Sequence, residues 1–200
     1  MANYAAEGIM ESVLAESDDG RWFREQAEFL VVPFMDKDGV EDGDQGKDRR
    51  PHDHNRDYHG RSIYPSVRAI RRFAPSWADG RLRLALDMHC PYIKDRSAYF
   101  VGTRDKANWE LLCRFSEVFD SLQTRPAILD PKHNISWDRP WDANAGPPRS
   151  STRWAATLDG IGLAMTSELP YAVSGEVPVT PDRARTFGRD LARTIRRWAD

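Results

Sequence analysis

Two short apolar runs that lead into polar residues constrain the fold of this 200-residue chain more than any other feature. The first run, 82–88, leads into His89, and the second, 162–166, leads into Glu168. Runs of this length are typical of buried strands, and segments with helical periodicity lie between them. Strands that alternate with helices favour an open α/β sheet. Because ligands bind beyond the carboxyl ends of strands in such sheets, we expect His89 and Glu168 on one rim.

The other elements follow from periodicity and from turn residues. We predict helices over 3–16, 67–77, 108–122, 154–158 and 181–198, and strands over 29–34, 82–88, 98–101 and 162–166. Pro75 is expected to stop the second helix, and Pro181 is expected to start the last one. Long polar loops are predicted over 36–64 and 130–151, and such loops are usually functional or disordered.

Length and composition narrow the class of protein. The chain suits one domain over 1–200, and its formal net charge of -2 favours neither a nucleic-acid nor a membrane partner. No apolar run approaches the ~18 residues of a membrane span. Cys90 and Cys113 make no disulfide framework, and no basic segment followed by an apolar stretch marks a secretory signal. We therefore expect a cytoplasmic protein.

The loop that contains Asp53-His54-Asn55-Arg56-Asp57-Tyr58 carries a candidate ligand site. A guanidinium is planar and offers two parallel donors to the two oxygens of a carboxylate. Arg56 is therefore a candidate for binding a carboxylate, and the amide of Asn55 would add a hydrogen bond. The alternative is an ordinary ion pair within the loop, between Arg56 and Asp53 or Asp57.

Three segments in order, 53–58, 86–91 and 165–170, resemble zinc carboxypeptidases of the carboxypeptidase A type. The segment 33–40 also resembles the run that leads into the substrate-binding loop of that family. The resemblance extends over about 5–170 and is nearer to bacterial relatives of the cytosolic carboxypeptidases than to digestive enzymes. It implies a mixed open sheet flanked by helices, as in zinc exopeptidases.

The resemblance also implies a reaction, the hydrolysis of C-terminal peptide bonds with one zinc ion. His89 corresponds to a zinc ligand of the family. Glu168 corresponds to the general base, which takes a proton from water and passes it to the leaving amine. A further arginine polarises the scissile carbonyl; Arg49 and Arg50 are the candidates, and we favour Arg50.

The resemblance assigns the substrate side as well. Asn55 and Arg56 would hold the C-terminal carboxylate of a peptide or protein. An ungapped count from Glu168 places Arg153 where the family selects the C-terminal side chain. We therefore expect a preference for acidic C-terminal residues.

The chain departs from the family in two ways. No His precedes His52, so the upstream His-x-x-Glu pair is absent. We expect a domain that lacks its first strands, with an incomplete zinc site and weak or no activity. The family also carries a Tyr on a mobile loop, and the corresponding count reaches Gly146 here. Trp137, Trp141 or Trp154 would line the cleft instead.

Two other functions remain open. The first is a non-catalytic protein that binds peptide C-termini through the Arg56 site without zinc. The second is a related zinc hydrolase of N-acyl amino acids, since that group shares the order of motifs. A metal held by the loop histidines His52, His54 and His59 is a weaker alternative.

Overall fold

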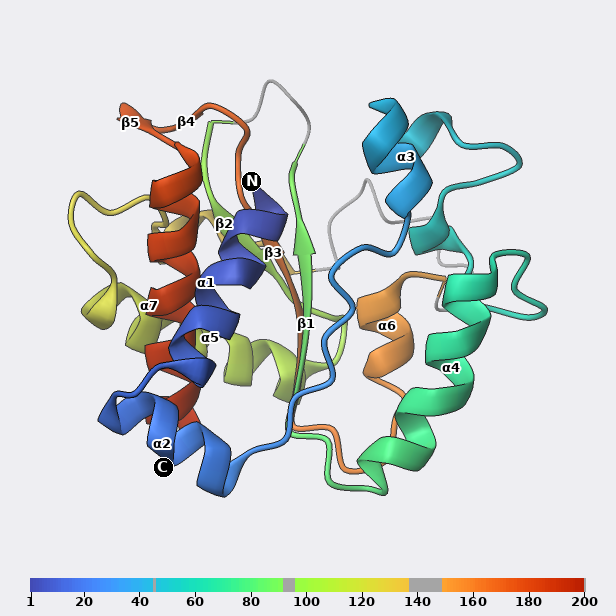
Figure 1. Cartoon of the computed structure of the whole chain (residues 1–200), viewed down its shortest axis with the longest axis horizontal. Helices are drawn as coiled ribbons and strands as arrows, with labels where there is room; N and C mark the ends of the chain where they lie inside the picture. Colours follow the sequence, from blue (N-terminus) through green and yellow to red (C-terminus); the bar gives the residue numbers. More distant parts are fainter. Residues whose placement is uncertain (45, 92–95, 137–148, 200) are drawn as a thin grey trace. The chain divides into compact units, whose positions relative to one another are not determined.

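The structure is a computed structural model, and it describes residues 1–44, 46–91, 96–136 and 149–199 (Figure 1). Contacts within the chain divide it into two compact units. Unit 1 consists of Met1–Phe29, Met88–Trp137 and Met165–Asp200, and unit 2 consists of Leu30–Asp87 and Asp138–Ala164. The candidate residues are therefore distributed over both units: His89 and Glu168 belong to unit 1, and the candidate arginines belong to unit 2.

Unit 1 is mainly helical. Its elements are α1 (Ala2–Leu14), α2 (Asp18–Gln26), β2 (Tyr99–Val101), α5 (Lys106–Leu122), η3 (Pro131–His133), β4 (Val173–Ser174), β5 (Val177–Pro178) and α7 (Pro181–Ala199). The helices predicted over 3–16, 108–122 and 181–198 are confirmed within two residues at each end. Helix α2 was not predicted, although Ser17 caps it by accepting a hydrogen bond from Gly20 N at 3.1 Å.

Helices α1 and α7 lie side by side and approach closely at two glycines (Figure 1). A Cβ on Gly8 would lie 2.0 Å from Arg185 O, and a Cβ on Gly188 would lie 1.9 Å from Ala5 O. Only glycine permits this approach at either position. An ion pair of 2.9 Å between Arg185 and Glu7 spans the same two helices.

The core of unit 1 is aromatic. Phe100 from β2 meets Phe115 and Phe119 from α5, with ring centroids 5.9 Å and 5.5 Å apart. Phe187 from α7 lies 5.0 Å from Phe119. These four rings are at most 1% exposed, so they supply much of the apolar area that holds β2 against the helices.

Unit 2 contains α3 (Lys37–Asp42), η1 (Gly46–Asp48), η2 (His54–Arg56), α4 (Pro65–Ala78) and α6 (Ser151–Ala155). Three short helical segments, α3, η1 and η2, thus lie within the long polar loop predicted over 36–64, and none of them was predicted. Asp36 accepts a hydrogen bond from Gly39 N at 3.1 Å and starts α3, and Gly43 ends it with a φ of 73°. These two caps make a helix out of a polar sequence that has no apolar periodicity.

The helix predicted over 67–77 begins earlier and does not stop at Pro75. Helix α4 starts with Pro65 in its first turn and includes Pro75. It ends where Asp79 adopts a left-handed conformation with a φ of 46°. Pro75 has no amide hydrogen to donate to the carbonyl of Arg71, so the helix continues past it without that one backbone bond. The helix predicted over 154–158 is displaced, because Ser150 caps α6 and starts it at Ser151.

The sheet has the strand order β1-β3-β2, where β1 is Leu84–His89 and β3 is Leu163–Glu168. Strand β2 pairs with β3 in antiparallel register, with Phe100 opposite Ser167. Two hydrogen bonds, each 2.9 Å long, join the ends of β1 and β3: Leu163 N donates to Arg83 O, and Leu169 N donates to His89 O. The donor and acceptor residues are separated by the same number of positions in both bonds. This pattern is parallel, so the predicted mixed sheet and its three strands over 82–88, 98–101 and 162–166 are confirmed.

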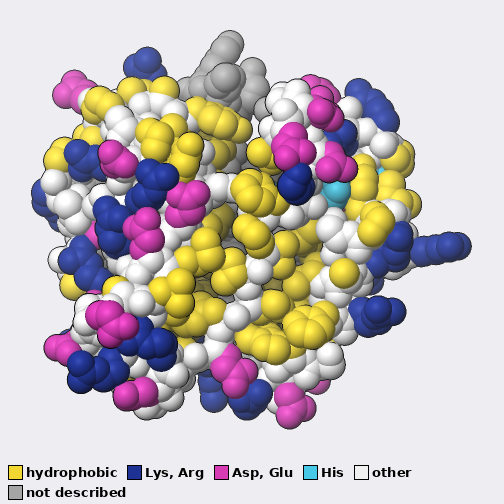
Figure 2. Space-filling view, viewed as in Figure 1, with side chains coloured by type: hydrophobic (Ala, Val, Ile, Leu, Met, Phe, Trp, Pro, Cys, Tyr) yellow, Lys and Arg dark blue, Asp and Glu magenta, His cyan; other side chains and the backbone are white. Residues whose placement is uncertain are grey.

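The strand predicted over 29–34 is wrong. These residues form no strand, and Phe29, Val31 and Phe34 are 38%, 43% and 44% exposed. A strand requires a hydrogen-bonded neighbour, and among the described residues the sheet places β1 as its outer strand with no partner beyond it. Figure 2 shows hydrophobic side chains open to solvent on the face in view.

The second predicted loop, 130–151, is described in part. It contains η3, and Ile135 forms an isolated parallel bridge with Val101. Trp137, Trp141 and Gly146 lie outside the described residues, so their predicted roles remain predictions. In the part of the chain that the structure describes, no helix is long and apolar enough to cross a membrane.

Candidate functional site

The turn that carries Arg56 is hydrogen-bonded to the start of α6. Ser151 N donates a hydrogen bond of 2.8 Å to Asn55 Oδ1. Tyr58 N donates to Arg149 O at 3.0 Å, two residues before α6. The Ser151 hydroxyl also hydrogen-bonds Asp87 in β1. These bonds join two segments that are distant in sequence, and they bring the turn of Asn55 and Arg56 to the helix that contains Arg153.

Arg56 itself is exposed. Its guanidinium donates to the neighbouring carbonyl Asn55 O at 3.1 Å. Among the described residues it forms no ion pair, so the alternative pairing with Asp53 or Asp57 does not occur. The cation of Arg56 is therefore not neutralised by a carboxylate of the described chain.

The two candidate arginines for the carbonyl differ in their surroundings. Arg49 donates from Nε and Nη2 to the two oxygens of Asp36 at 2.8 Å and 3.0 Å, and it pairs with Asp44 at 2.9 Å. The hydrogen bond from Arg49 holds the pKa of Asp36 below its usual value. Arg50 is exposed and donates to the backbone carbonyl Asp48 O at 3.0 Å. This geometry favours Arg50 as the arginine available to a ligand.

Histidines 52 and 54 take part in the packing of the turn. His54 stacks on Tyr64 with ring centroids 3.7 Å apart, and its Nδ1 lies 3.5 Å from Asp36 Oδ2. Burial lowers the pKa of His54. His52 Nε2 lies 2.9 Å from Asp57 Oδ1. Both imidazoles therefore have partners within the loop.

His89 and Glu168 lie at the carboxyl ends of β1 and β3. The hydrogen bond from Leu169 N to His89 O, 2.9 Å long, joins the two strand ends directly. The expectation that both residues occupy one rim of the sheet is therefore confirmed. Neighbouring strand ends are the usual position of catalytic groups in open α/β sheets.

Tyr171 is a neighbour of this rim that was not predicted from the sequence. It follows Glu168 by three positions and is 44% exposed. Burial of part of its ring raises the pKa of Tyr171, and a hydrogen bond to Cys90 and the charge of Glu168 raise it further. Its closeness in sequence to Glu168 was the available signal.

Comparisons with known proteins identify the fold. No protein-family model matches the chain, and no curated protein matches its sequence. A metallo-carboxypeptidase from Burkholderia cenocepacia superposes with a TM-score of 0.73 at 16% identity, over 99% of this chain and 53% of its own. A protein from Shewanella denitrificans OS-217 that is provisionally named carboxypeptidase A superposes with a TM-score of 0.75 at 16% identity, over 97% and 52%.

This chain has a carboxypeptidase-like fold. A provisionally named carboxypeptidase from Burkholderia mallei ATCC 23344 gives the same result, with a TM-score of 0.72 at 15% identity, over 98% of this chain and 52% of its own. The chain therefore spans about half the length of the solved structures that it matches. At these identities the likeness establishes the fold.

The described residues can be compared with the ligand set that a catalytic zinc ion needs. A catalytic zinc site has three protein ligands and one open position. Among the described residues, no group of three or more His, Cys, Asp and Glu side chains could hold a metal ion. His89 and the loop histidines thus do not form a three-ligand centre with described neighbours, and the one-zinc expectation stays a prediction.

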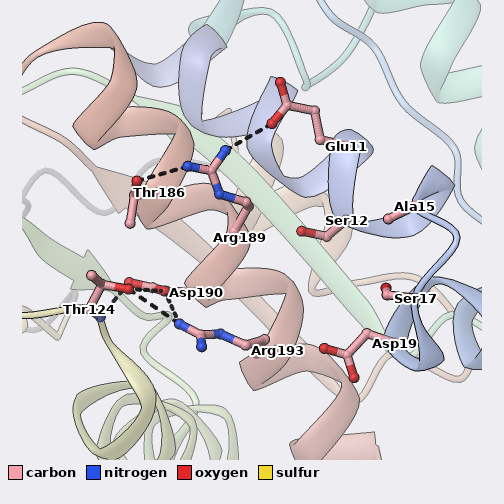
Figure 3. Close-up of a pocket in the computed structure, with 10 residues that line it drawn as sticks. All are labelled: Glu11, Ser12, Ala15, Ser17, Asp19, Thr124, Thr186, Arg189, Asp190 and Arg193. Atoms are coloured by element: carbon pink, nitrogen blue, oxygen red, sulfur yellow. Dashed lines mark hydrogen bonds and ion pairs between the residues drawn. The ribbon is translucent and has the colours of Figure 1, made fainter.

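A hollow in unit 1 is separate from the candidate residues (Figure 3). Its volume is about 510 Å³, and residues from α1, α7 and the segments beside them line it. Arg189 pairs with Glu11 at 2.9 Å, and Arg193 pairs with Asp190, which also accepts from Thr124 N at 2.7 Å. Asp19 pairs with Arg196. Because the charged side chains that line this hollow are already paired, it is not a candidate for a charged ligand.

Proposed function

We propose that this chain is a metallocarboxypeptidase-type hydrolase that acts on the C-termini of peptides or proteins in the cytoplasm. One observation carries the proposal. Arg56 is exposed and without an ion pair in the described chain, although acidic residues lie on both sides of it in the sequence. The residues beside it are fastened by hydrogen bonds, so the guanidinium extends from a fixed backbone. The carboxypeptidase-like fold is the second support.

The proposed roles follow the chemistry of each side chain. Arg56 binds the two oxygens of the terminal carboxylate, and Asn55 adds a hydrogen bond. Arg50 stabilises the charge that develops on the scissile carbonyl oxygen. Glu168 accepts a proton from the attacking water and returns it to the leaving amine. His89 is the one zinc ligand that the resemblance assigns.

A release assay tests the hydrolytic part of this proposal. The substrate is an N-acetylated tripeptide with a free C-terminal carboxylate, and release of its last residue is measured with added zinc and with a chelator. We expect slow release that needs zinc and that falls at least about 100-fold in Glu168→Gln, because a general base contributes about 10²–10⁴-fold. Release that is equal with chelator, or unchanged in Glu168→Gln, contradicts the proposal.

A second candidate function is the non-catalytic binding of peptide C-termini through the Arg56 site. A chain that keeps the Arg56 site without a metal would bind peptide C-termini and leave them intact. Binding that persists in chelator, together with no release in zinc, would establish this function in place of hydrolysis. Release from N-acyl amino acids but not from peptides would instead indicate the acyl amino acid hydrolase.

A further inference from the structure

The turn that carries Arg56 is too small to hold its own shape. Helix η2 has three residues and two backbone hydrogen bonds, Arg56 N to Asp53 O at 3.0 Å and Asp57 N to His54 O at 3.1 Å. The side chain of Asp53 does not cap it. A single 3₁₀ turn is not stable alone, because its hydrogen bonds do not offset the ordering of the backbone. Its geometry must therefore depend on groups outside the turn.

Asp57 is one of these groups. It is 2% exposed, and its carboxylate accepts hydrogen bonds from Ile63 N at 3.1 Å and from Tyr64 N at 3.0 Å. His52 Nε2 lies 2.9 Å from the same carboxylate. Burial alone would raise the pKa of Asp57, but the bonds from Tyr64, His52 and Ile63 together hold it below its usual value. Asp57 therefore remains ionised at neutral pH and fastens the end of the turn.

Tyr64 connects this anchor to the start of the turn. Its hydroxyl donates to His52 O, and its ring stacks on His54, the first residue of η2. The backbone N of Tyr64 donates to Asp57, which follows the last residue of η2. Tyr64 thus contacts both ends of the turn, so a change at Asp57 alters the position of His54 as well.

The same contacts explain why Asp57 does not neutralise the arginine beside it. The Asp57 carboxylate accepts from the backbone amides of Ile63 and Tyr64 and lies against His52. Arg56 therefore keeps only its own hydrogen bond, to Asn55 O. Asn55 is held on the other side by Ser151 N. Both neighbours of Arg56 are fixed while its guanidinium reaches solvent.

We propose that Asp57 is a positioning residue, whose buried carboxylate fixes the 54–56 turn so that the Arg56 guanidinium is presented to the carboxylate of a ligand. This inference rests on the proposed function, since it needs Arg56 to bind a peptide C-terminus. A merely structural Asp57 would stabilise unit 2 without affecting how well a free carboxylate is distinguished from an amide. The ratio of those two affinities therefore separates the two roles.

The test measures dissociation constants for an N-acetylated tripeptide and for its C-terminal amide, by calorimetry in the presence of chelator. The variants are Asp57→Asn, which keeps the shape but replaces an acceptor by a donor, and Arg56→Ala. Asp159→Asn is the matched control, because Asp159 is an exposed acid of the same unit. Thermal unfolding of each variant is followed in parallel.

The affinities are measured at a temperature where the variant is folded. We expect Asp57→Asn to weaken binding of the free acid about tenfold and to leave binding of the amide unchanged. Asp159→Asn should match the wild type for both peptides. A folded Asp57→Asn protein with an unchanged ratio overturns the inference. If Asp57→Asn does not fold, His52→Ala decides instead, since it removes one of the three partners of the Asp57 carboxylate from a half-buried position. We expect His52→Ala to lower the preference for the free acid over the amide by about threefold. An unchanged preference would overturn the inference.

The failure of the proposed function is distinguishable from the failure of this inference. If the wild type does not favour the free acid, or if Arg56→Ala keeps that preference, the carboxylate site is wrong and the inference is wrong with it. If Arg56→Ala abolishes the preference and Asp57→Asn keeps it, the site is right and the positioning role alone is wrong.

Discussion

Neighbouring arginines in the same loop have different physical roles. Arg49 is bound at both edges by Asp36 and Asp44, whereas Arg50 is exposed with backbone partners only. Arg49→Ala should therefore lower the stability of the protein, because it removes the guanidinium that pairs with the half-buried carboxylate of Asp36. Arg50→Ala should change the free energy of unfolding by about 0.5 kcal/mol or less. Urea unfolding of both variants tests this difference, and equal losses would contradict the assignment.

The lowered pKa values of Asp36 and Asp57 predict an acid-sensitive loop. Both carboxyls have folded-state pKa values below their unfolded value of about 3.9. Their contribution to stability is therefore complete well above that pH and is lost as the pH falls through the folded values. Denaturant unfolding between pH 6 and pH 2 should show this decline, and Asp36→Asn should show a smaller one. A loss of stability with falling pH that is as steep in Asp36→Asn as in the wild type would contradict this prediction.

Arg153 is proposed to select the side chain of the C-terminal residue. A cation at that position favours a glutamate over a leucine in a ligand of equal length. We expect peptides that end in Glu to bind more tightly than peptides that end in Leu, and we expect Arg153→Gln to remove the difference. Tighter binding of the Leu peptide to the wild type is the contrary result. Arg81→Gln, an exposed arginine of the same unit, serves as the control.

At the scale of elements, α1 and α7 depend on two glycines. A side chain on Gly188 would meet the backbone of Ala5, which cannot move aside as a flexible side chain would. Gly188→Val should therefore destabilise the protein by about 3 kcal/mol, at the upper end of overpacking costs. The control is Gly46→Ala, where a Cβ has nothing within 4 Å. Thermal unfolding compares the two, and a stable Gly188→Val protein would contradict the packing.

The elements that the sequence predicted correctly are those with a strong local pattern. Helix α7 and strands β1 and β3 have clear periodicity or a continuous apolar run. The segment 29–34 has the same apolar character as β1 but forms no strand, because pairing depends on a neighbour rather than on local composition. Helix α3 was missed for the opposite reason. Its capping residues define it, and its polar sequence gave no periodic signal.

At the scale of the whole molecule, the order of motifs was enough to indicate the fold. The carboxypeptidase-like neighbours share about 16% identity with this chain, so few positions carry the likeness. The positions of His89 and Glu168 at strand ends were also predictable. The role of Asp57 was not, because it arises from contacts with Ile63 and Tyr64 that no spacing rule specifies.

The most direct test of the central claim is the affinity of Arg56 for a terminal carboxylate. Calorimetry with a free-acid peptide and its amide, on the wild type, Arg56→Ala and Arg72→Ala, isolates that single contact. Arg72 is an exposed arginine of α4 and serves as the control. We predict that the wild type and Arg72→Ala favour the acid by about 10- to 100-fold, as hydrogen bonds to charged groups contribute about 1.5–3 kcal/mol, and that Arg56→Ala shows no preference. Equal affinity of the wild type for both peptides would contradict the account.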